Sequence, residues 1–201
     1  MPVSADQIKE LRAATGAGVL DCRNALEKAG GDLEKAMAIL REKGLAKAAK
    51  RSDREASEGF LELYSHGDGR VGVIVEVNSE TDFVARSEAF RNFAHEIALQ
   101  IAAGAPRFIS PEDIPAEVLE EEREKSRRLA LDEGKPDSIV DRIVEGRLEK
   151  FMNENCLMRQ QYIRVEDITV EQLLHQTIVA VGENVLIRRF VRWEVGESTD
   201  T

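Results

Sequence analysis

The segment Asn78-Ser79-Glu80-Thr81-Asp82-Phe83-Val84-Ala85-Arg86 marks the change from strand to helix that decides the fold of this chain. Before it, valines at positions 71, 73, 75 and 77 have the period of a half-buried strand. After it, apolar residues recur at three and four positions and predict one helical face; they are Phe90, Phe93, Ala94, Ile97, Ala98 and Ile101. Phe83 lies upstream of that face. Residue statistics alone favour its burial in the core, whereas its place at a junction between elements favours its display as a contact.

The length and composition of the chain indicate a globular protein. Its 201 residues, 42% of them hydrophobic, suffice for one domain or two small ones. No apolar run approaches the ~20 residues that span a bilayer, and the start of the chain has no signal or transit pattern. We therefore expect a cytoplasmic protein. Cys22 and Cys156 have neither a disulfide framework nor zinc-site spacing around them, so we expect both to be reduced.

The charge balance argues against nucleic acid as a direct partner. There are 38 acidic and 28 basic residues, and the net charge of −10 repels a phosphate backbone. A local exception is formed by basic residues that would share one side of a helix over residues 45–57; they are Lys47, Lys50, Arg51 and Arg54. No aromatic residues are interleaved for base stacking, so the pattern favours a solvated charged linker.

Residues 1–45 predict a domain of three short helices. Ser4 and Gln7 have the spacing of a capping box, and Asp32 is placed to cap the third helix. Glycines at positions 16, 18, 30 and 31 separate the helices, and Gly44 is expected to end the third one. We expect a charged helical linker over residues 46–57, a core domain over 58–195 and a disordered tail over 196–201.

The core pattern predicts an α+β fold with a small antiparallel sheet of about three strands and several helices. Residues 60–64 and 71–77 flank His66-Gly67-Asp68-Gly69, which indicates a β-hairpin, and residues 185–195 predict a third antiparallel strand. The glycines from Gly67 to Gly72 match G-x-G-x-x-G, but they lie between two strands rather than before a helix, so we reject a dinucleotide site. Between the hairpin and the last strand, Pro111, Gly134-Lys135-Pro136 and Thr169 punctuate a mostly helical region.

No catalytic constellation is visible, and we expect a binding protein rather than an enzyme, without cofactor or metal. The three histidines are scattered, and P-loop, nucleophile-elbow and zinc-protease motifs do not occur. A run of glutamates between positions 117 and 124 is interleaved with arginine and lysine at helical spacing. This favours a salt-bridged helix over a metal site.

Several motifs together resemble the bacterial elongation factor Ts family over nearly the whole chain, to about Gly196. They are Leu11-Arg12, Thr15-Gly16-Ala17-Gly18, Asp21-Cys22-Arg23-Asn24-Ala25-Leu26, Thr81-Asp82-Phe83-Val84, Gly134-Lys135-Pro136, Glu145-Gly146-Arg147 and Gly182-Glu183-Asn184.

The resemblance implies a guanine-nucleotide exchange factor for elongation factor Tu, a GTPase of translation elongation. The amino-terminal domain would be ubiquitin-associated-like in fold and would dock on the GTP-binding domain of the partner through Arg12, Val19 and Leu20. The last two stand where methionine is common in the family. Thr81, Asp82, Phe83 and Val84 match the core signature, whose Asp and Phe are understood to disturb the partner's Mg²⁺ and phosphate contacts, so that GDP leaves and GTP can rebind. This implication reverses the statistical expectation for Phe83.

The chain resembles the short form of the family. Longer members carry two similar α/β halves and an extra helical hairpin, whereas here we find one hairpin sheet and one final strand. A small sheet whose helices cover only one face leaves the other bare, so we expect a homodimer and a two-plus-two complex with elongation factor Tu.

Two rival interpretations remain. In the first, the three-helix domain belongs to an adaptor that binds ubiquitin or a peptide, although Thr15-Gly16-Ala17-Gly18 stands where such domains typically have a Met-Gly-Phe type loop. In the second, the chain is a cofactor enzyme that binds a dinucleotide at residues 67–72.

Overall fold

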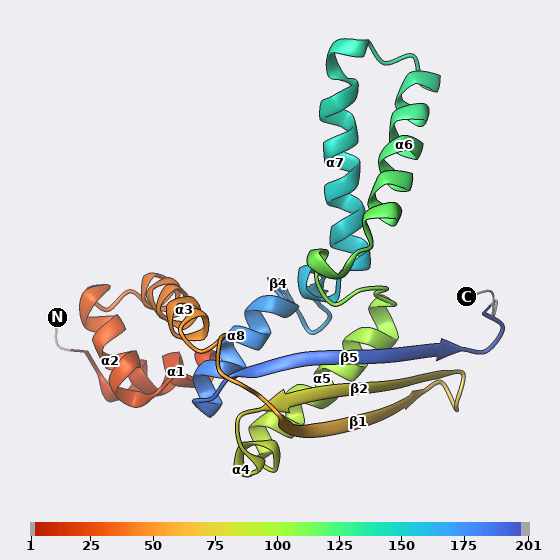
Figure 1. Cartoon of the computed structure of the whole chain (residues 1–201). Helices are drawn as coiled ribbons and strands as arrows, with labels where there is room; N and C mark the ends of the chain where they lie inside the picture. The colour runs from red at the N-terminus through yellow and green to blue at the C-terminus, as the bar shows by residue number, and fades with distance from the viewer. Residues whose placement is uncertain (1–2, 198–201) are drawn as a thin grey trace. The chain divides into compact units, whose positions relative to one another are not determined.

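The computed structural model describes residues 3–197, so residues 198–201 of the expected tail lie outside the described part. The fold is α+β, as predicted, and the chain forms two compact units (Figure 1). The first unit contains the residues up to Ala98 and those from Glu171 onward, and the second is Leu99–Val170. The predicted division at residues 45 and 58 stays a prediction.

Three helices open the chain, as predicted: α1 (Ala5–Thr15), α2 (Val19–Lys28) and α3 (Leu33–Ala49). The capping box is present, with Gln7 N donating to Ser4 Oγ at 3.2 Å and Ser4 N donating to Gln7 Oε1 at 3.0 Å. Asp32 Oδ1 accepts from the backbone of Lys35, which satisfies a free amide at the start of α3. The helices bury a shared core of small and aliphatic side chains, namely Leu11, Ala17, Cys22, Ala25, Leu26, Ala36 and Leu40.

The predicted end of the third helix at Gly44 is wrong, and of the predicted helical linker only residues 46–49 are helical. Helix α3 runs through Gly44 to Ala49, and the chain then turns. Gly44 lies inside the helix and near Val179, and a Cβ there would come within 3.4 Å of Val179 Cγ2, an ordinary contact distance. Two of the basic residues that were expected to be solvated also make contacts within the chain, although the Arg54 side chain stays 54% exposed. Arg51 donates to the carbonyl of Ile178 at 3.0 Å, and Arg54 pairs with Glu80 at 3.4 Å.

The first unit contains a three-stranded antiparallel sheet in the order β1-β2-β5, which confirms the predicted hairpin and third strand. Its strands are β1 (Glu58–His66), β2 (Val71–Ser79) and β5 (Val185–Glu194). Gly67 and Gly69 lie in the turn between β1 and β2 with φ of 59° and 87°, in the left-handed region that favours glycine. The G-x-G-x-x-G match therefore comes from a hairpin turn.

Helix α5 (Glu88–Gly104) covers one face of this sheet (Figure 1). Its predicted apolar stripe is buried, as are the four valines of β2. On β1, Phe60 lies under the guanidinium of Arg91 at 4.0 Å, and Glu62 Oε1 is 2.8 Å from His95 Nδ1. Even-numbered residues of β1 thus face α5, and the residues between them face the opposite side.

A β-bulge at Arg188 changes which residues of β5 face α5: odd-numbered residues face it before the bulge, and even-numbered residues face it after the bulge. Glu76 pairs with Arg189, and the next residue of β2 pairs with Ile187, so one residue of β5 has no partner. Before the bulge, Ile187 is buried at 7% exposure on the α5 side. After it, Val191 and Trp193 lie on the opposite side with 43% and 70% exposure.

The second unit is dominated by α6 (Ala116–Asp132) and α7 (Asp137–Asn155), which run antiparallel as a helical hairpin (Figure 1). The sequence predicted both helices but not their pairing. The Arg123–Glu145 and Arg127–Asp141 ion pairs join them at 2.8 and 2.6 Å. Within α6, the Arg123–Glu120 and Lys125–Glu122 pairs confirm the predicted salt bridges at helical spacing. The hairpin buries a small core of Ala130, Val140, Val144 and Leu148.

The remaining elements are short, apart from one helix. A 3-10 turn, η1 (Pro111–Asp113), precedes α6, and η2 (Leu157–Arg159) follows α7. Strands β3 (Gln161–Tyr162) and β4 (Val165–Thr169) form a two-stranded sheet that was not predicted, because neither is long enough for a clear alternation. Helix α8 (Val170–Val181) begins directly after Thr169. Within residues 3–197, no helix is long and apolar enough to cross a membrane.

Candidate functional site

The most exposed large apolar side chain described is that of Phe83, at 82% exposure. It lies on α4 (Asp82–Ala85), a single helical turn that follows β2. The next two residues, Val84 and Ala85, are only 6% and 5% exposed. They anchor the turn while Phe83 points into solvent, so the expectation of burial from residue statistics is wrong.

The neighbours of Phe83 stabilise this turn. Thr81 is its N-cap, and the threonine hydroxyl accepts from Val84 N at 3.4 Å. Asp82 lies in the first turn, where a negative charge is favourable, and pairs with Arg86 at 2.9 Å. Both charged side chains are largely exposed, so the pair contributes little to stability and leaves Asp82 accessible.

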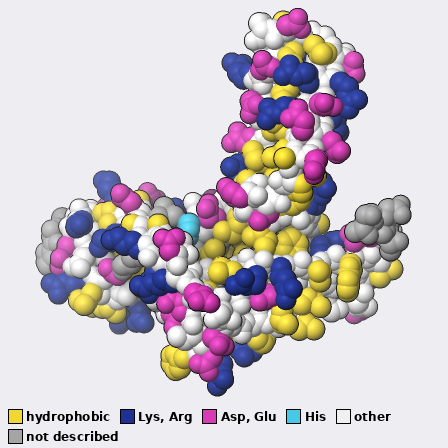
Figure 2. Space-filling model, in the orientation of Figure 1, with side chains coloured by type: hydrophobic (Ala, Val, Ile, Leu, Met, Phe, Trp, Pro, Cys, Tyr) yellow, Lys and Arg dark blue, Asp and Glu magenta, His cyan; other side chains and the backbone are white. Residues whose placement is uncertain are grey.

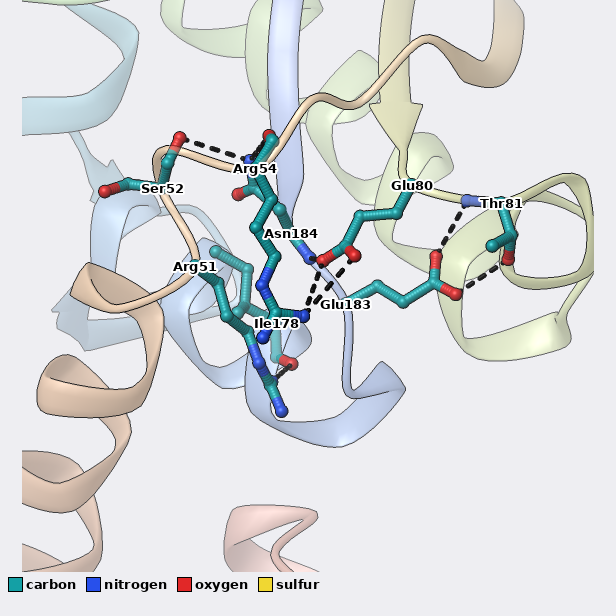
Figure 3. Close-up of polar contacts among 8 residues, drawn as sticks. All are labelled: Arg51, Ser52, Arg54, Glu80, Thr81, Ile178, Glu183 and Asn184. Carbon is teal, nitrogen blue, oxygen red and sulfur yellow. Dashed lines mark hydrogen bonds and ion pairs between the residues drawn. The ribbon is translucent and has the colours of Figure 1, made fainter.

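Thr81 is in turn held by Glu183, a residue of the turn between α8 and β5 (Figure 3). The two oxygens of the Glu183 carboxylate accept from the backbone N–H of Thr81 at 3.0 Å and from its hydroxyl at 2.7 Å. Hydrogen bonds to a charged acceptor are stronger than neutral ones, and the two together fix an orientation.

The same turn is tied to the segment that follows α3 (Figure 3). Asn184 Nδ2 donates to the carbonyls of Arg54 and Ser52 at 2.9 and 3.4 Å. Its backbone N–H donates to Glu80 Oε1 at 2.6 Å, and Arg54 pairs with the same carboxylate. Sequence reasoning noticed Gly182-Glu183-Asn184 only as a family match and gave these residues no role. A local pattern carries no signal for contacts across 102 positions.

The second group of predicted contact residues lies at the corner between α1 and α2. Val19 and Leu20 open α2 and are 50% and 72% exposed, and Arg12 is exposed in the last turn of α1. Gly18, the N-cap of α2, has no side chain to cap the helix. The first two residues of the helix, Val19 and Leu20, form an exposed apolar pair. The structure thus places Thr81–Val84 together on one short turn, Arg12 in the last turn of α1, and Val19 and Leu20 in the first turn of α2.

Two of the histidines contact side chains of β1. His66 Nδ1 is 2.9 Å from the Tyr64 hydroxyl, and His95 is paired with Glu62 on the sheet. Among residues 3–197, no cluster of three or more metal-ligating side chains occurs. Both cysteines are free and buried, and burial raises the pKa of the Cys156 thiol, which keeps it protonated and unreactive.

Comparisons with known proteins agree with the motifs. The family described as Elongation factor TS matches residues 5–197. The Elongation factor Ts of Caldanaerobacter subterraneus subsp. tengcongensis is 60% identical over 198 residues, which is 98% of this chain and 99% of that protein. The Elongation factor Ts of Coprothermobacter proteolyticus is 51% identical over 197 residues, with 98% and 100% coverage.

Proposed function

The chain belongs to the elongation factor Ts family, and from that premise we propose that it binds elongation factor Tu carrying GDP and promotes release of the nucleotide. GTP can then rebind, and the partner returns to translation elongation in the cytoplasm. No covalent bond changes in such an exchange, so the protein needs no catalytic group, cofactor or metal of its own.

The observation that carries the proposal is the exposed Phe83 on an anchored turn. An exposed aromatic side chain breaks no contacts in the core of its own protein when it inserts into a partner. Its burial in the partner is favourable because apolar surface is removed from water. Asp82 beside it carries a negative charge, which would compete with the contacts that the partner makes to the phosphates and Mg²⁺ of its nucleotide. We propose that these two side chains, flanked by Thr81 and Val84, are the part that disturbs the nucleotide site of the partner.

The thermodynamics require more than this turn. The exchange factor and GDP each weaken the other's hold on the common partner, which is a reciprocal coupling through a ternary complex. A thousandfold faster release needs a barrier lower by about 4 kcal/mol. Burial of one Phe contributes roughly 2 to 3 kcal/mol. The remaining binding free energy must come from other contacts.

We assign part of that contribution to the corner formed by Arg12, Val19 and Leu20. Two exposed aliphatic side chains beside an arginine have the composition of a small docking patch, with an apolar centre and a charged rim. In our proposal this patch holds the GTP-binding domain of the partner, while Phe83 acts at the nucleotide site.

We further propose that the protein works as a homodimer that pairs through the bare face of its sheet and binds two partners. Leu63, Ile74 and Val191 lie opposite one another across the three strands, at 69%, 37% and 43% exposure. Trp193 is in the adjacent row, and Figure 2 shows hydrophobic side chains gathered over these strands. A second copy would cover this face with an identical one, which is how two-fold dimers form.

The test is release of a fluorescent GDP analogue from purified bacterial elongation factor Tu, with excess unlabelled GDP, with and without a catalytic amount of this protein. We expect accelerated release. Failure to accelerate release from a cognate partner contradicts the proposal and favours the adaptor interpretation, which a binding assay with ubiquitin-like proteins or peptides then tests.

A further inference from the structure

We propose that Glu183 is a positioning residue for nucleotide exchange: it fixes Thr81 and thereby the direction in which Phe83 points. This inference rests on the proposed function and adds to it a residue outside the Thr81–Val84 motif, from the opposite end of the chain. Glu183 does not need to touch the partner or the nucleotide.

Helix α4 cannot fix itself. It has four residues, and one helical turn is unstable alone because nucleation costs more free energy than a single hydrogen bond returns. Its cap is also long, with 3.4 Å between Val84 N and the Thr81 hydroxyl oxygen. Phe83, at 82% exposure, makes too little contact with the core to orient itself. The buried Val84 and Ala85 anchor the end of the turn, so the direction of the Phe83 side chain is set at the other end, by how the backbone enters the turn at Thr81.

Glu183 determines that entry with both of its oxygens. Oε2 accepts from the backbone N–H of Thr81, and Oε1 accepts from the hydroxyl. Since the hydroxyl proton points to Glu183, a lone pair of the same oxygen remains for the N–H of Val84. The carboxylate thus holds the backbone and orients the cap at once (Figure 3).

The anchor is itself fixed from two sides. Gly182 adopts φ of 81°, which lets the chain turn sharply after α8. Asn184 then donates from its backbone to Glu80 and from its side chain to the carbonyls of Ser52 and Arg54. Glu183 is the residue between these two, so its carboxylate extends from a turn that has little freedom to move.

The experiment combines Glu183→Ala and Glu183→Gln with the presence or absence of the Phe83 side chain. The saturating rate of GDP-analogue release and the half-saturating concentration are measured in the full chain. We expect Glu183→Ala to lower the saturating rate by about five- to tenfold, since hydrogen bonds to a charged group are lost, with little change in the half-saturating concentration. Glu183→Gln keeps one acceptor oxygen and is expected to recover part of the rate. The matched control, Glu171→Ala, removes an exposed carboxylate from the preceding helix and should leave the rate unchanged.

The double variant distinguishes positioning from an independent contact. In the Phe83→Ala background we expect Glu183→Ala to lower the rate by a smaller factor, because the aromatic ring is absent and only Asp82 remains on the turn to be positioned. An equal fold-loss in both backgrounds overturns the inference, and so does a parental saturating rate in Glu183→Ala.

Amide hydrogen exchange of the protein alone separates this inference from the proposed function. We expect the Thr81 and Val84 amides to exchange faster in Glu183→Ala while those of the β2 interior keep parental protection. If the parent does not accelerate GDP release, the proposed function fails, but this measurement still tests whether Glu183 holds the turn. Unchanged protection at Thr81 and Val84 overturns the positioning role.

Discussion

Glu183 accepts two hydrogen bonds from Thr81, a residue 102 positions earlier in the sequence. The motif that displays Phe83 therefore depends on a turn formed by a later part of the chain. A short signature read by itself contains the displayed side chain but not the contact that orients it.

Replacing Phe83 by alanine should slow exchange without unfolding the protein. The ring is 82% exposed, so its loss costs the fold little, while the burial it would gain in the partner is worth roughly 2 to 3 kcal/mol. We expect the saturating rate of GDP release to fall by about ten- to a hundredfold, with much of the affinity for elongation factor Tu retained. Identical exchange rates for variant and parent at matched Tm would contradict the role of the ring.

Removal of the Thr81 hydroxyl should weaken the turn. Thr81→Val keeps the shape of the side chain but loses the cap of α4 and the 2.7 Å hydrogen bond to Glu183, a loss of about 1 kcal/mol in the stability of the turn. We expect a lower saturating rate and faster amide exchange at Val84. Thr81→Ser keeps the hydroxyl and serves as the control; the prediction fails if serine and valine behave alike.

A charge at the corner between α1 and α2 should weaken docking rather than the exchange step. Leu20 is 72% exposed, and Leu20→Asp places a carboxylate where an apolar contact is proposed. We expect the half-saturating concentration to rise by about tenfold or more, since burying a leucine is worth about 1.5 to 3 kcal/mol. The saturating rate should stay near that of the parent.

The control for this variant is Leu129→Asp, which introduces the same charge at an exposed leucine of α6, 48% exposed. An equal rise in the half-saturating concentration for both variants would mean that added charge, and not the α1–α2 corner, is responsible.

A charge in the middle of the bare sheet face should separate the dimer. Leu63 lies opposite Ile74 and is 69% exposed, so Leu63→Glu would bring two carboxylates into a two-fold interface. Light scattering or sedimentation equilibrium should give a dimer mass for the parent and for Leu129→Glu, and a monomer mass for Leu63→Glu. A strictly monomeric parent at high concentration rules the dimer out.

Acid should destabilise the sheet partly through Glu76. The hydrogen bond from Arg189, at 2.7 Å, holds the pKa of Glu76 below its ordinary value near 4.5. A carboxyl with a lowered pKa in the folded state contributes stability that is fully present above the ordinary value. That contribution is lost as the pH falls from about 4.5 through the lowered pKa. Glu76→Gln should therefore show a shallower decline of Tm below pH 4.5, measured by thermal unfolding. Parallel pH profiles for variant and parent would contradict this assignment.

The parts of the fold that sequence reasoning predicted are those with local causes. The valines of β2, the stripe of α5 and the capping box at Ser4 each follow from spacing within a few residues. The end of α3 at Gly44 was predicted wrongly because a glycine that ends a helix and a glycine inside one look the same in a sequence. The neighbour of Gly44 in the fold, Val179, lies far along the chain.

The candidate site divides in the same way. Thr81–Val84 was found from its motif and its place at a junction. The exposure of Phe83 was indicated by its place at a junction and by the family resemblance, against residue statistics that average over all folds. Glu183 was missed as a contact because a glutamate in a turn has many possible roles, and only the folded chain brings it to Thr81.

The bulge at Arg188 changes the parity of the last strand. A regular strand would commit Val185, Ile187, Val191 and Trp193 to one side, and all four would then be interior residues. The additional residue in the bulge divides these four residues into two pairs. Val185 and Ile187 are buried and stabilise the monomer, whereas Val191 and Trp193 are exposed on the opposite side of the sheet. Val191 and Trp193 are thereby separated from the buried Ile187, and their substitution can alter association in evolution without eroding the interior. Deleting Arg188 would restore a regular ladder and still leave Val191 and Trp193 facing away from Ile187.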